Sequence, residues 1–530
     1  MNSRIHATRL GSRLFALLFC GLAGCAGPGP KLFPPTPVAE HRLPDGRVER
    51  GYDTDRDGRP DYRELLSNEG RIVLLRFDLD RDGELDLEVD RTALSGDDVR
   101  HLVILLDSVP YAMVRRLWDQ GRFRYFDRPS RVISPFPVMT DLCFADFFGV
   151  TPCIGVEAEY YDGHVLRGGF ARYADGENSP WLTFTDYHMS FFAHGLAYFD
   201  SLAWYGHELR RIQDQFGRRG HGDFVGYCVG TSALGAQLGP NGHWAGLVRL
   251  DSFCRQIMHQ TRGRVQITLM SDHGHNNERG VRISIRHALT DLGYRVTQRL
   301  VEPSDVVVPT FGMVTFAAVH TTFPQRVAGD LVGVEGVDLT CYLDGSDRVV
   351  VVSSTGRARI SKSPAGYRYE AEFGDPLRLG AILNKLAAQN QVDADGFVGD
   401  RVLFEATADH RYPDGVHRLW RAFHGVTEHT PDVLVSITDG WYAGSGFMSR
   451  MLDLAAAHGN LETLSSNAFV MTTAGRLPPV LRMEDLRGAL RDVGVRVAGA
   501  DDSGVLPVGT LPPVLGHRVV EQREEPILVD

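Results

Sequence analysis

The stretch VQITLMSDHGH, residues 265–275, organises the interpretation of the whole chain. Its alternating apolar residues predict a buried strand that ends abruptly at Ser-Asp-His-Gly. Where helices cover a sheet, ligand sites lie at the carboxyl ends of the strands, so Asp272 and His273 are expected to project together into such a site. A carboxylate beside an imidazole is a good donor pair for zinc or a similar divalent ion. The alternative is a capping aspartate and a hydrogen-bonded histidine at a strand-to-loop junction.

Length and composition predict a folded chain with more than one domain. The sequence has 530 residues, of which 43% are apolar, which is ample material for a large core. The formal net charge is -11, and no basic face of the kind that binds nucleic acid is evident. Nucleic acid is therefore excluded as an expected partner.

Residues 1–24 have the pattern of a secretory signal. Three arginines precede the apolar run LFALLFCGLAG, which is too short to span a membrane. The run closes on Leu-Ala-Gly-Cys, which resembles a bacterial lipobox and implies cleavage before Cys25 and lipidation of its thiol. An ordinary signal peptide with an incidental cysteine is the alternative. Residues 25–48 would then be a lipidated, Pro-rich tether that anchors the chain at the cell envelope, facing either the periplasm or the surface.

Two similar acidic stretches follow within residues 49–92, DTDRDGRPDYRE and DLDRDGELDLEV. Both have Asp at loop positions one, three, five and nine and Gly at six, the spacing of calcium-binding loops. The second copy has Val89 at position twelve, and flanking helices are not evident. An acidic, solvated turn is the alternative to a structural calcium site. The expected ligands are Asp53, Asp55, Asp57, Asp61, Glu64, Asp78, Asp80, Asp82 and Asp86.

Five cysteines remain after the leader and Cys25 are set aside. In an oxidising compartment some of them could pair, and at least one would be left over. Cys143 with Cys153 is the first expectation, because both lie in one loop-rich segment. The five are Cys143, Cys153, Cys228, Cys254 and Cys341.

Two further motifs precede the opening stretch. VRHLVILLDSVP, residues 99–110, predicts a buried strand that ends at Asp107. ISPFPVMTD predicts a Pro-containing loop that leads into a helix at Thr140, where free backbone amides can support an anion. These motifs, followed by Ser-Asp-His-Gly, together resemble the alkaline phosphatase superfamily, over residues 99–300 and 402–495.

The resemblance implies an α/β fold with a central, largely parallel sheet sandwiched by helices. It also implies a single metal held by Asp107, Thr140, Asp272 and His273, with Thr140 as the nucleophile. A threonine hydroxyl is a poor nucleophile unless a metal or a base activates it. A divalent ion, most readily zinc, would do this and would neutralise a phosphoryl oxygen.

The sequence departs from the family at the second metal site. The family places Asp and His four residues apart on one helix face, and here these positions are Ser232 and Ala236. His458 matches the third ligand of this second site. It is a weak metal candidate, because one histidine alone cannot hold zinc. We therefore expect one metal in the main domain. Four nearby or similar residues match the pattern less well: His424, His243, Asp200 and His207.

The segments around these motifs suggest a divided main domain. Residues 97–300 are expected to form the first part of the core and residues 402–497 the second. VLVSITDG, residues 433–440, is expected to return to the core sheet. Residues 301–401 alternate like strands and suggest an inserted α+β subdomain, and residues 498–530 suggest an extended tail.

Two functions fit the sequence. The first is an envelope-anchored, metal-dependent hydrolase or transferase acting on phosphate esters, similar to the one-metal phosphoethanolamine transferases of the superfamily. The second is a non-catalytic lipoprotein whose degenerate phosphatase-like domain binds a ligand or supports structure at the envelope. Fold alone does not decide between them.

Overall fold

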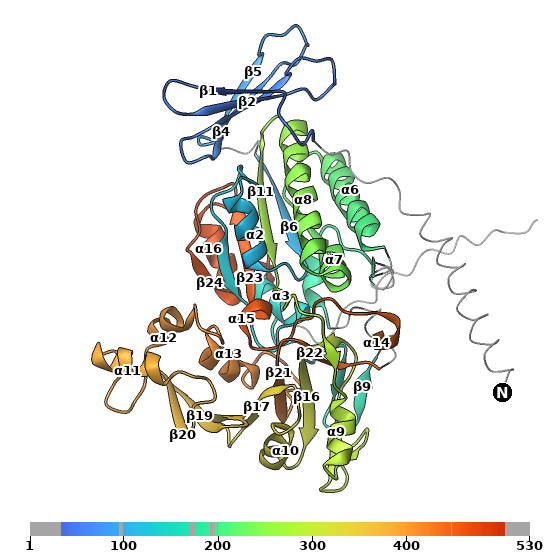
Figure 1. Ribbon diagram of the computed structural model, residues 1–530, viewed down its shortest axis with the longest axis vertical. Helices are drawn as coiled ribbons and strands as arrows, with labels where there is room; N and C mark the ends of the chain where they lie inside the picture. Colours follow the sequence, from blue (N-terminus) through green and yellow to red (C-terminus); the bar gives the residue numbers. More distant parts are fainter. Residues whose placement is uncertain are drawn as a thin grey trace, which may run out of the picture.

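The structure is a computed structural model that describes residues 33–503, apart from 95–98, 170–172, 174, 175, 177, 191–193, 195, 196, 199 and 447. The expected leader, Cys25 and most of the tail lie outside these residues. Figure 1 shows three parts along the long axis of the molecule: a small β-module at one end, a sheet with helices in the middle, and a second sheet at the other end. The fold is mixed α/β, as the sequence predicts. No described helix is long and apolar enough to cross a membrane.

The N-terminal module is a five-stranded antiparallel sheet in the order β1-β2-β3-β4-β5. The two acidic stretches form the loops that join β2 to β3 and β4 to β5, so both lie between strands rather than helices. Aromatic rings fix the module to the main domain, since Phe33, Tyr62 and Phe77 all contact the ring of His259. The strands are β1 Ala39–Arg42, β2 Val48–Tyr52, β3 Tyr62–Leu66, β4 Ile72–Phe77 and β5 Leu87–Asp90.

The core sheet has the strand order β10-β6-β11-β23-β7-β24. Only β23 runs against the others, because β10, β6 and β11 pair in parallel, as do β7 and β24, while both partners of β23 are antiparallel to it. The strands are β6 Arg100–Leu106, β7 Ser130–Ile133, β10 Phe224–Cys228, β11 Val265–Ser271, β23 Asn467–Thr472 and β24 Val480–Arg482.

Helices cover both faces of this sheet. Leu102, Ile104 and Leu106 of β6 pack with α2, α6 and α8, whereas Val103 and Leu105 pack with α3 and α16. A strand buried on both faces explains why its sequence is a nearly continuous apolar run. The helices are α2 Tyr111–Asp119, α3 Thr140–Phe148, α6 Ser201–Arg219, α7 Gly230–Leu238, α8 Pro240–Gln260, α15 Thr463–Ser466, α16 Met483–Asp492 and α17 Ala500–Ser503.

The second sheet has eight strands in the order β13-β14-β16-β21-β17-β18-β19-β20. The strands are β13 Arg295–Val296, β14 Asp305–Val307, β16 Phe316–Thr321, β17 Val337–Leu343, β18 Arg348–Ser353, β19 Gly356–Ser363, β20 Gly366–Phe373 and β21 Val433–Ile437. Its helices are α9 Ile285–Asp291, α10 Pro324–Leu331, α11 Gly380–Ala388, α12 Asp400–Thr407 and α13 Gly415–Ala422. Smaller elements are β8 Glu159–Tyr161, β9 Leu166–Gly168, η1 Pro180–Phe184, β12 Val281–Arg282, β15 Met313–Val314, β22 Trp441–Gly444 and α14 Met448–Met451.

The expectation that residues 433–440 return to the core sheet is wrong. They form β21, which pairs antiparallel with β16 and β17 at the centre of the second sheet. A short apolar run predicts a buried strand but carries no information about which sheet the strand joins.

The expected Cys143–Cys153 disulfide is also absent. All five described cysteines are free and buried. Cys143 lies in α3 and packs in the cluster around the core sheet, whereas Cys153 packs with residues of the second sheet. The two thiols therefore belong to different cores, although they are close in sequence.

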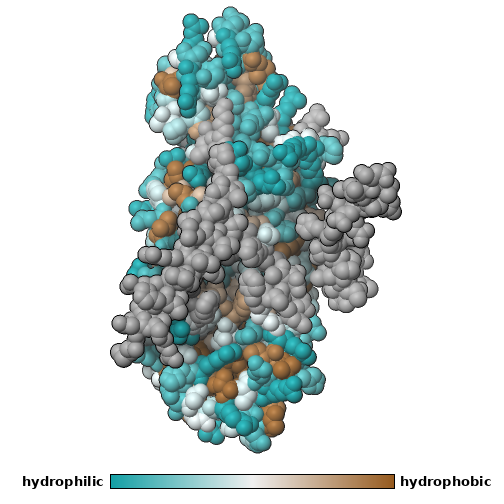
Figure 2. Space-filling view, turned by 90° about the vertical axis from the view of Figure 1, so that its right-hand side faces the viewer, coloured by the Kyte–Doolittle hydropathy of each residue, from teal (hydrophilic) through white to brown (hydrophobic). Residues whose placement is uncertain are grey.

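The surface is uneven in character. Figure 2 shows hydrophobic residues gathered at the end of the molecule that the second sheet occupies. Exposed large apolar side chains of this part include Val281, Leu292, Val301, Phe323 and Phe373.

Candidate metal centre

The two strand-end aspartates meet because of strand register. Leu106 at the end of β6 lies opposite Ser271 at the end of β11, and Asp107 and Asp272 are the next residues of each strand. Ligand atoms of Asp107, Asp272 and His273 all lie within 4.8 Å of one another, and the three residues are buried. The structure therefore brings together the three strongest metal ligands that the sequence predicts.

Thr140 is the first residue of α3 and completes the group. Its hydroxyl lies 3.3 Å from Nε2 of His273. Nδ1 of His273 lies 3.0 Å from the carbonyl of Gly274, and because a carbonyl can only accept, Nδ1 must donate. Burial lowers the pKa of His273, so the ring is neutral and Nε2 has a free lone pair. Nε2 thus accepts the threonine proton or binds a cation.

The hydrogen bonding of the Asp272 carboxylate indicates that these residues suit a cation. Its Oδ1 accepts the backbone amides of Ser108 at 2.8 Å and His273 at 2.7 Å. Its Oδ2 is buried, has no hydrogen-bond partner, and lies 3.3 Å from Nε2 of His273. Burial and then the negative charge of Asp107 raise the pKa of Asp272 well above its usual range. An orphaned carboxylate oxygen beside an imidazole and a second carboxylate is the donor set that a divalent ion needs.

Hydroxyl groups that the sequence did not single out hold Asp107. Tyr227 donates its hydroxyl to Oδ2 at 2.6 Å, and Ser108 donates to Oδ1 at 2.6 Å. Tyr227 lies on β10 directly beside β6, where it is opposite Leu105. Tyr227 could be assigned to the site only if the pairing of β10 with β6 were known, and the sequence alone does not give that pairing.

The two positions that the resemblance assigns to a second metal are Ser232 and Ala236. The Ser232 hydroxyl lies 3.2 Å from the hydroxyls of both Ser108 and Tyr198. Ala236 is buried in a small apolar cluster with Tyr442 and Leu454. Hydroxyl and apolar groups therefore surround these two positions.

His458 lies beside the metal group without joining it. Its ring stacks on that of His273 at a centroid distance of 4.0 Å, and Nδ1 donates to the carbonyl of Val138 at 2.9 Å. Burial lowers the pKa of His458 to about 3. A further buried pair, His243 and His275, lies next to it: their Nε2 and Nδ1 atoms are 3.1 Å apart, and the His275 ring is 5.5 Å from that of His458. The structure thus places His243 as a buried residue close to the centre, outside the group of Asp107, Asp272 and His273.

The other sequence candidates serve structure. Asp200 accepts the amide of Ala203 at the start of α6, and the His424 ring stacks on Trp420 at 4.0 Å. Asp439, which directly follows β21 and Thr438, accepts a hydrogen bond from Nδ2 of Asn460 at 2.8 Å. Burial raises the pKa of Asp439 to about 7.

The two acidic loops have the same internal geometry. In the first, Asp53 accepts the amides of Arg56 and Gly58 at 2.6 and 2.9 Å. In the second, Asp78 accepts from the matching amides at 2.7 and 2.9 Å. Ligand atoms at positions one, three and five lie within 4.8 Å of one another in both loops, as three carboxylates each: Asp53, Asp55 and Asp57, and Asp78, Asp80 and Asp82. Position nine closes each loop by accepting a backbone amide, from Thr54 to Asp61 and from Leu79 to Asp86.

Glu64 is the exception and corrects the expected ligand set. It lies in β3, is fully buried, and accepts from Nη1 of Arg255 at 2.9 and 2.7 Å and from the Tyr125 hydroxyl. Alternation along β3, which begins at Tyr62, turns this side chain toward the main domain. Its carboxylate therefore neutralises an arginine of α8 instead of completing a calcium loop.

Comparison with known proteins identifies no family for the chain. No family model matches the sequence, and no curated protein is significantly similar to it. Among solved structures, murine ectonucleotide pyrophosphatase/phosphodiesterase 5 is similar with a TM-score of 0.39 and 10% identity, covering 75% of this chain and 95% of that chain. Phosphonoacetate hydrolase from Sinorhizobium meliloti 1021 is similar with the same TM-score and identity, covering 79% and 99%. Values this low transfer neither fold details nor activity, so the functional argument rests on the residues themselves.

Proposed function

We propose that the chain is a metal-dependent hydrolase or transferase acting on phosphate esters, with Thr140 as its nucleophile. The observation that carries the proposal is the convergence of Asp107, Asp272 and His273 around a carboxylate oxygen that has no partner. A divalent ion bound there would lower the pKa of a hydroxyl and neutralise charge on a phosphoryl group.

The residues of the chain supply the remaining requirements. Thr140 is the first residue of α3, where unpaired backbone amides and the helix dipole favour a phosphate group. Its hydroxyl lies 3.3 Å from Nε2 of His273, so an ion held by that nitrogen would lie beside the hydroxyl and would lower its pKa. Tyr227 and Ser108 hold both oxygens of Asp107 in place. Zinc is the proposed ion, because one imidazole and two carboxylates suit it.

A lipid on Cys25 and a Pro-rich tether would hold this domain at a bacterial cell envelope. The lipobox-like sequence supports this part of the proposal. We propose that calcium in the two acidic loops is structural. The matching arrangement of three aspartates in each loop supports calcium binding. Glu64 is no longer among the proposed ligands, because it pairs with Arg255.

A non-catalytic envelope protein is the second candidate, and one observation favours it. Ser232 and Ala236 leave the position of the second metal without acid or imidazole, and Ala236 sits in an apolar cluster. A domain of this kind would bind a phosphate-bearing ligand or support envelope structure without catalysing a reaction.

Metal content and turnover, measured on the same preparations, test the proposal. Wild type should hold one ion in the main domain, counted apart from calcium, and should hydrolyse a generic phosphomonoester or diester. Asp272→Asn should empty the site, whereas His458→Ala should leave metal content nearly unchanged. Asp409→Asn is a matched control, because this carboxylate is 92% exposed, pairs with Arg131 and is not among the residues of the group.

Two further variants separate the candidates. Thr140→Ala should abolish turnover while retaining the metal. Ser232→Asp combined with Ala236→His should add a second ion if the site is merely degenerate. Two zinc ions in the wild-type domain would contradict the one-metal centre. A metal-bound wild type without turnover, and a double variant that gains it, would establish the non-catalytic candidate.

A further inference from the structure

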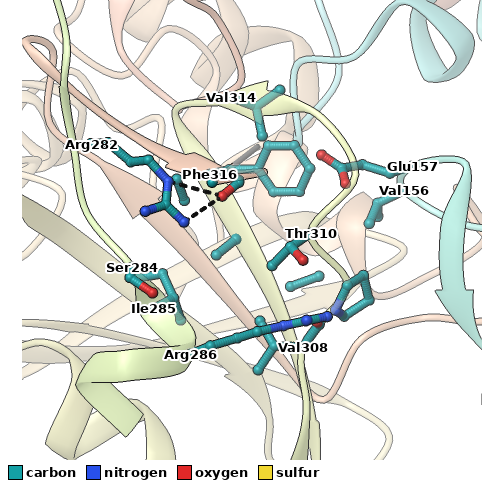
Figure 3. Close-up of a pocket in the computed structure, with 16 residues that line it drawn as sticks. Val156, Glu157, Arg282, Ser284, Ile285, Arg286, Val308, Thr310, Val314 and Phe316 are labelled. Atoms are coloured by element: carbon teal, nitrogen blue, oxygen red, sulfur yellow. Dashed lines mark hydrogen bonds between the residues drawn. The ribbon is translucent and has the colours of Figure 1, made fainter. Parts of the chain in front are cut away.

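A separate cavity lies between the second sheet and the small sheet formed by β12, β22 and β15. Its volume is about 130 Å³, and Figure 3 shows side chains directed into it from several segments. An engineered protein cavity of about 150 Å³ holds one benzene molecule, so this space accommodates a ligand of about six non-hydrogen atoms. Much of the wall is apolar, contributed by Val156, Ile285, Val308, Val314, Phe316 and Ala318.

A buried carboxyl group lies at the inner side of the cavity. Glu157 is only 6% exposed, and its Oε2 accepts the amides of Phe311 at 3.1 Å and Gly312 at 3.4 Å. No described hydrogen bond uses its Oε1. Burial raises the pKa of Glu157 to about 7, against the opposing effect of these two amides. Near neutral pH this group can therefore donate or accept a hydrogen bond, and it becomes charged beside a cation.

Two arginines line the outer side. Arg282 donates Nε and Nη2 to the carbonyl of Gly444 at 3.2 and 2.9 Å, as the dashed lines in Figure 3 show. Arg286 donates the same two atoms to the carbonyl of Val308 at 3.0 and 2.6 Å. Each guanidinium is thus fixed in orientation, while its Nη1 takes part in no described hydrogen bond.

The two arginines carry more positive charge than the nearby carboxylates offset. Nη2 of Arg286 lies 3.6 Å from Oε2 of Glu159, which offsets one positive charge. Among the described residues, no carboxylate lies within ion-pair distance of Arg282. The outer side of the cavity therefore attracts an anion, and a fixed guanidinium suits a planar carboxylate.

We propose that this cavity binds a small carboxylate whose other end carries a hydroxyl or amino group, the chemistry of hydroxy acids and amino acids. The carboxylate pairs with Arg282 and Arg286, the carbon atoms lie against Phe316, and the second polar group bonds to Glu157. This site shares no side chain with the metal centre. The two sites are connected through the backbone: Thr315 lies between the cavity residues Val314 and Phe316, and its amide donates to the carbonyl of His458 at 2.7 Å.

Calorimetric titration of the whole folded chain with five probes tests the proposal: L-lactate, L-serine, L-alanine, acetate and ethanolamine. Lactate, or serine and alanine, should bind with a dissociation constant of about 1 mM, as befits so few atoms. Acetate and ethanolamine each lack one of the two polar ends and should bind at least about tenfold more weakly. Binding of none of the three two-ended probes, or equal binding of all five, would overturn the proposal.

Variants locate the binding and identify the ligand class. Arg282→Ala should remove it, and so should Ala318→Val, which fills the cavity with apolar atoms and retains the strand. Arg299→Ala is the matched control and should bind as wild type does. Glu157→Gln keeps a donor and an acceptor, so it should retain hydroxy-acid binding but weaken amino-acid binding about tenfold through the lost charge. Wild-type affinity in Ala318→Val would show that the probes bind elsewhere and would refute the site.

Discussion

Replacing Glu64 with alanine should destabilise the protein strongly and independently of calcium. Its carboxylate is fully buried and takes two contacts from Nη1 of Arg255, at 2.9 and 2.7 Å, together with the Tyr125 hydroxyl. Arg255 is itself 8% exposed, so Glu64→Ala leaves a buried charge without its main partner. The variant therefore removes one half of an ion pair that joins the N-terminal module to α8.

The size of the effect follows from burial. Breaking a buried ion pair by deleting one partner costs about 3–5 kcal/mol. Asp251 lies 3.9 Å from Nε of Arg255 and partly compensates the charge, so the lower end, about 3 kcal/mol, is expected. Glu88→Ala is the control, because its pair with Arg76 is 2.8 Å long but Glu88 is 57% exposed. Such a surface pair contributes about 0–1 kcal/mol.

Urea denaturation in chelator and in saturating calcium measures both effects. The loss of unfolding free energy in Glu64→Ala should be the same in the two conditions, because Glu64 is not a calcium ligand. Calcium should still stabilise the variant as much as it stabilises wild type. A loss seen only in calcium would make Glu64 a ligand after all and refute this reasoning, as would a loss no larger than that of Glu88→Ala.

Three more predictions concern other parts of the chain. Calcium added after chelation should raise the melting temperature of wild type, and no shift would contradict calcium binding by the acidic loops. Cys25→Ala should release the protein from membranes, and a variant that still fractionates with them after a high-salt wash would exclude the lipid anchor. Stability should fall as pH rises from about 4.5 through about 7, because folded Glu157 holds a proton that the unfolded chain releases; urea titrations of Glu157→Gln should lack this component.

The sequence located Asp107, Thr140, Asp272 and His273 better than the residues that surround them. Asp107, Thr140, Asp272 and His273 follow or begin regular elements, so local pattern locates them, and parallel pairing of β6 with β11 then brings the aspartates together. Tyr227 and His243 reach the centre only through contacts between elements that are distant in sequence.

The failures have the same physical cause. The loop motif gave Glu64 a ligand position, but strand alternation and a partner on α8, about 190 residues away, decide where its side chain lies. The strand at 433–437 has an apolar sequence that fits either sheet, and only its pairing with β16 and β17 assigns it. Cys143 and Cys153 are near neighbours in sequence that pack into separate cores.

Helix α8 contacts the buried histidines beside the metal centre near one end and the N-terminal module near the other. Near its start, His243 contacts His275, two residues beyond the proposed metal ligand His273, and near its end Arg255 and His259 hold the N-terminal module. Its 21 residues span about 30 Å. The chain enters the described structure at Phe33, whose ring packs on that of His259. The part of α8 between these contacts, residues 243–259, therefore separates the N-terminal module from the buried histidines by about 24 Å.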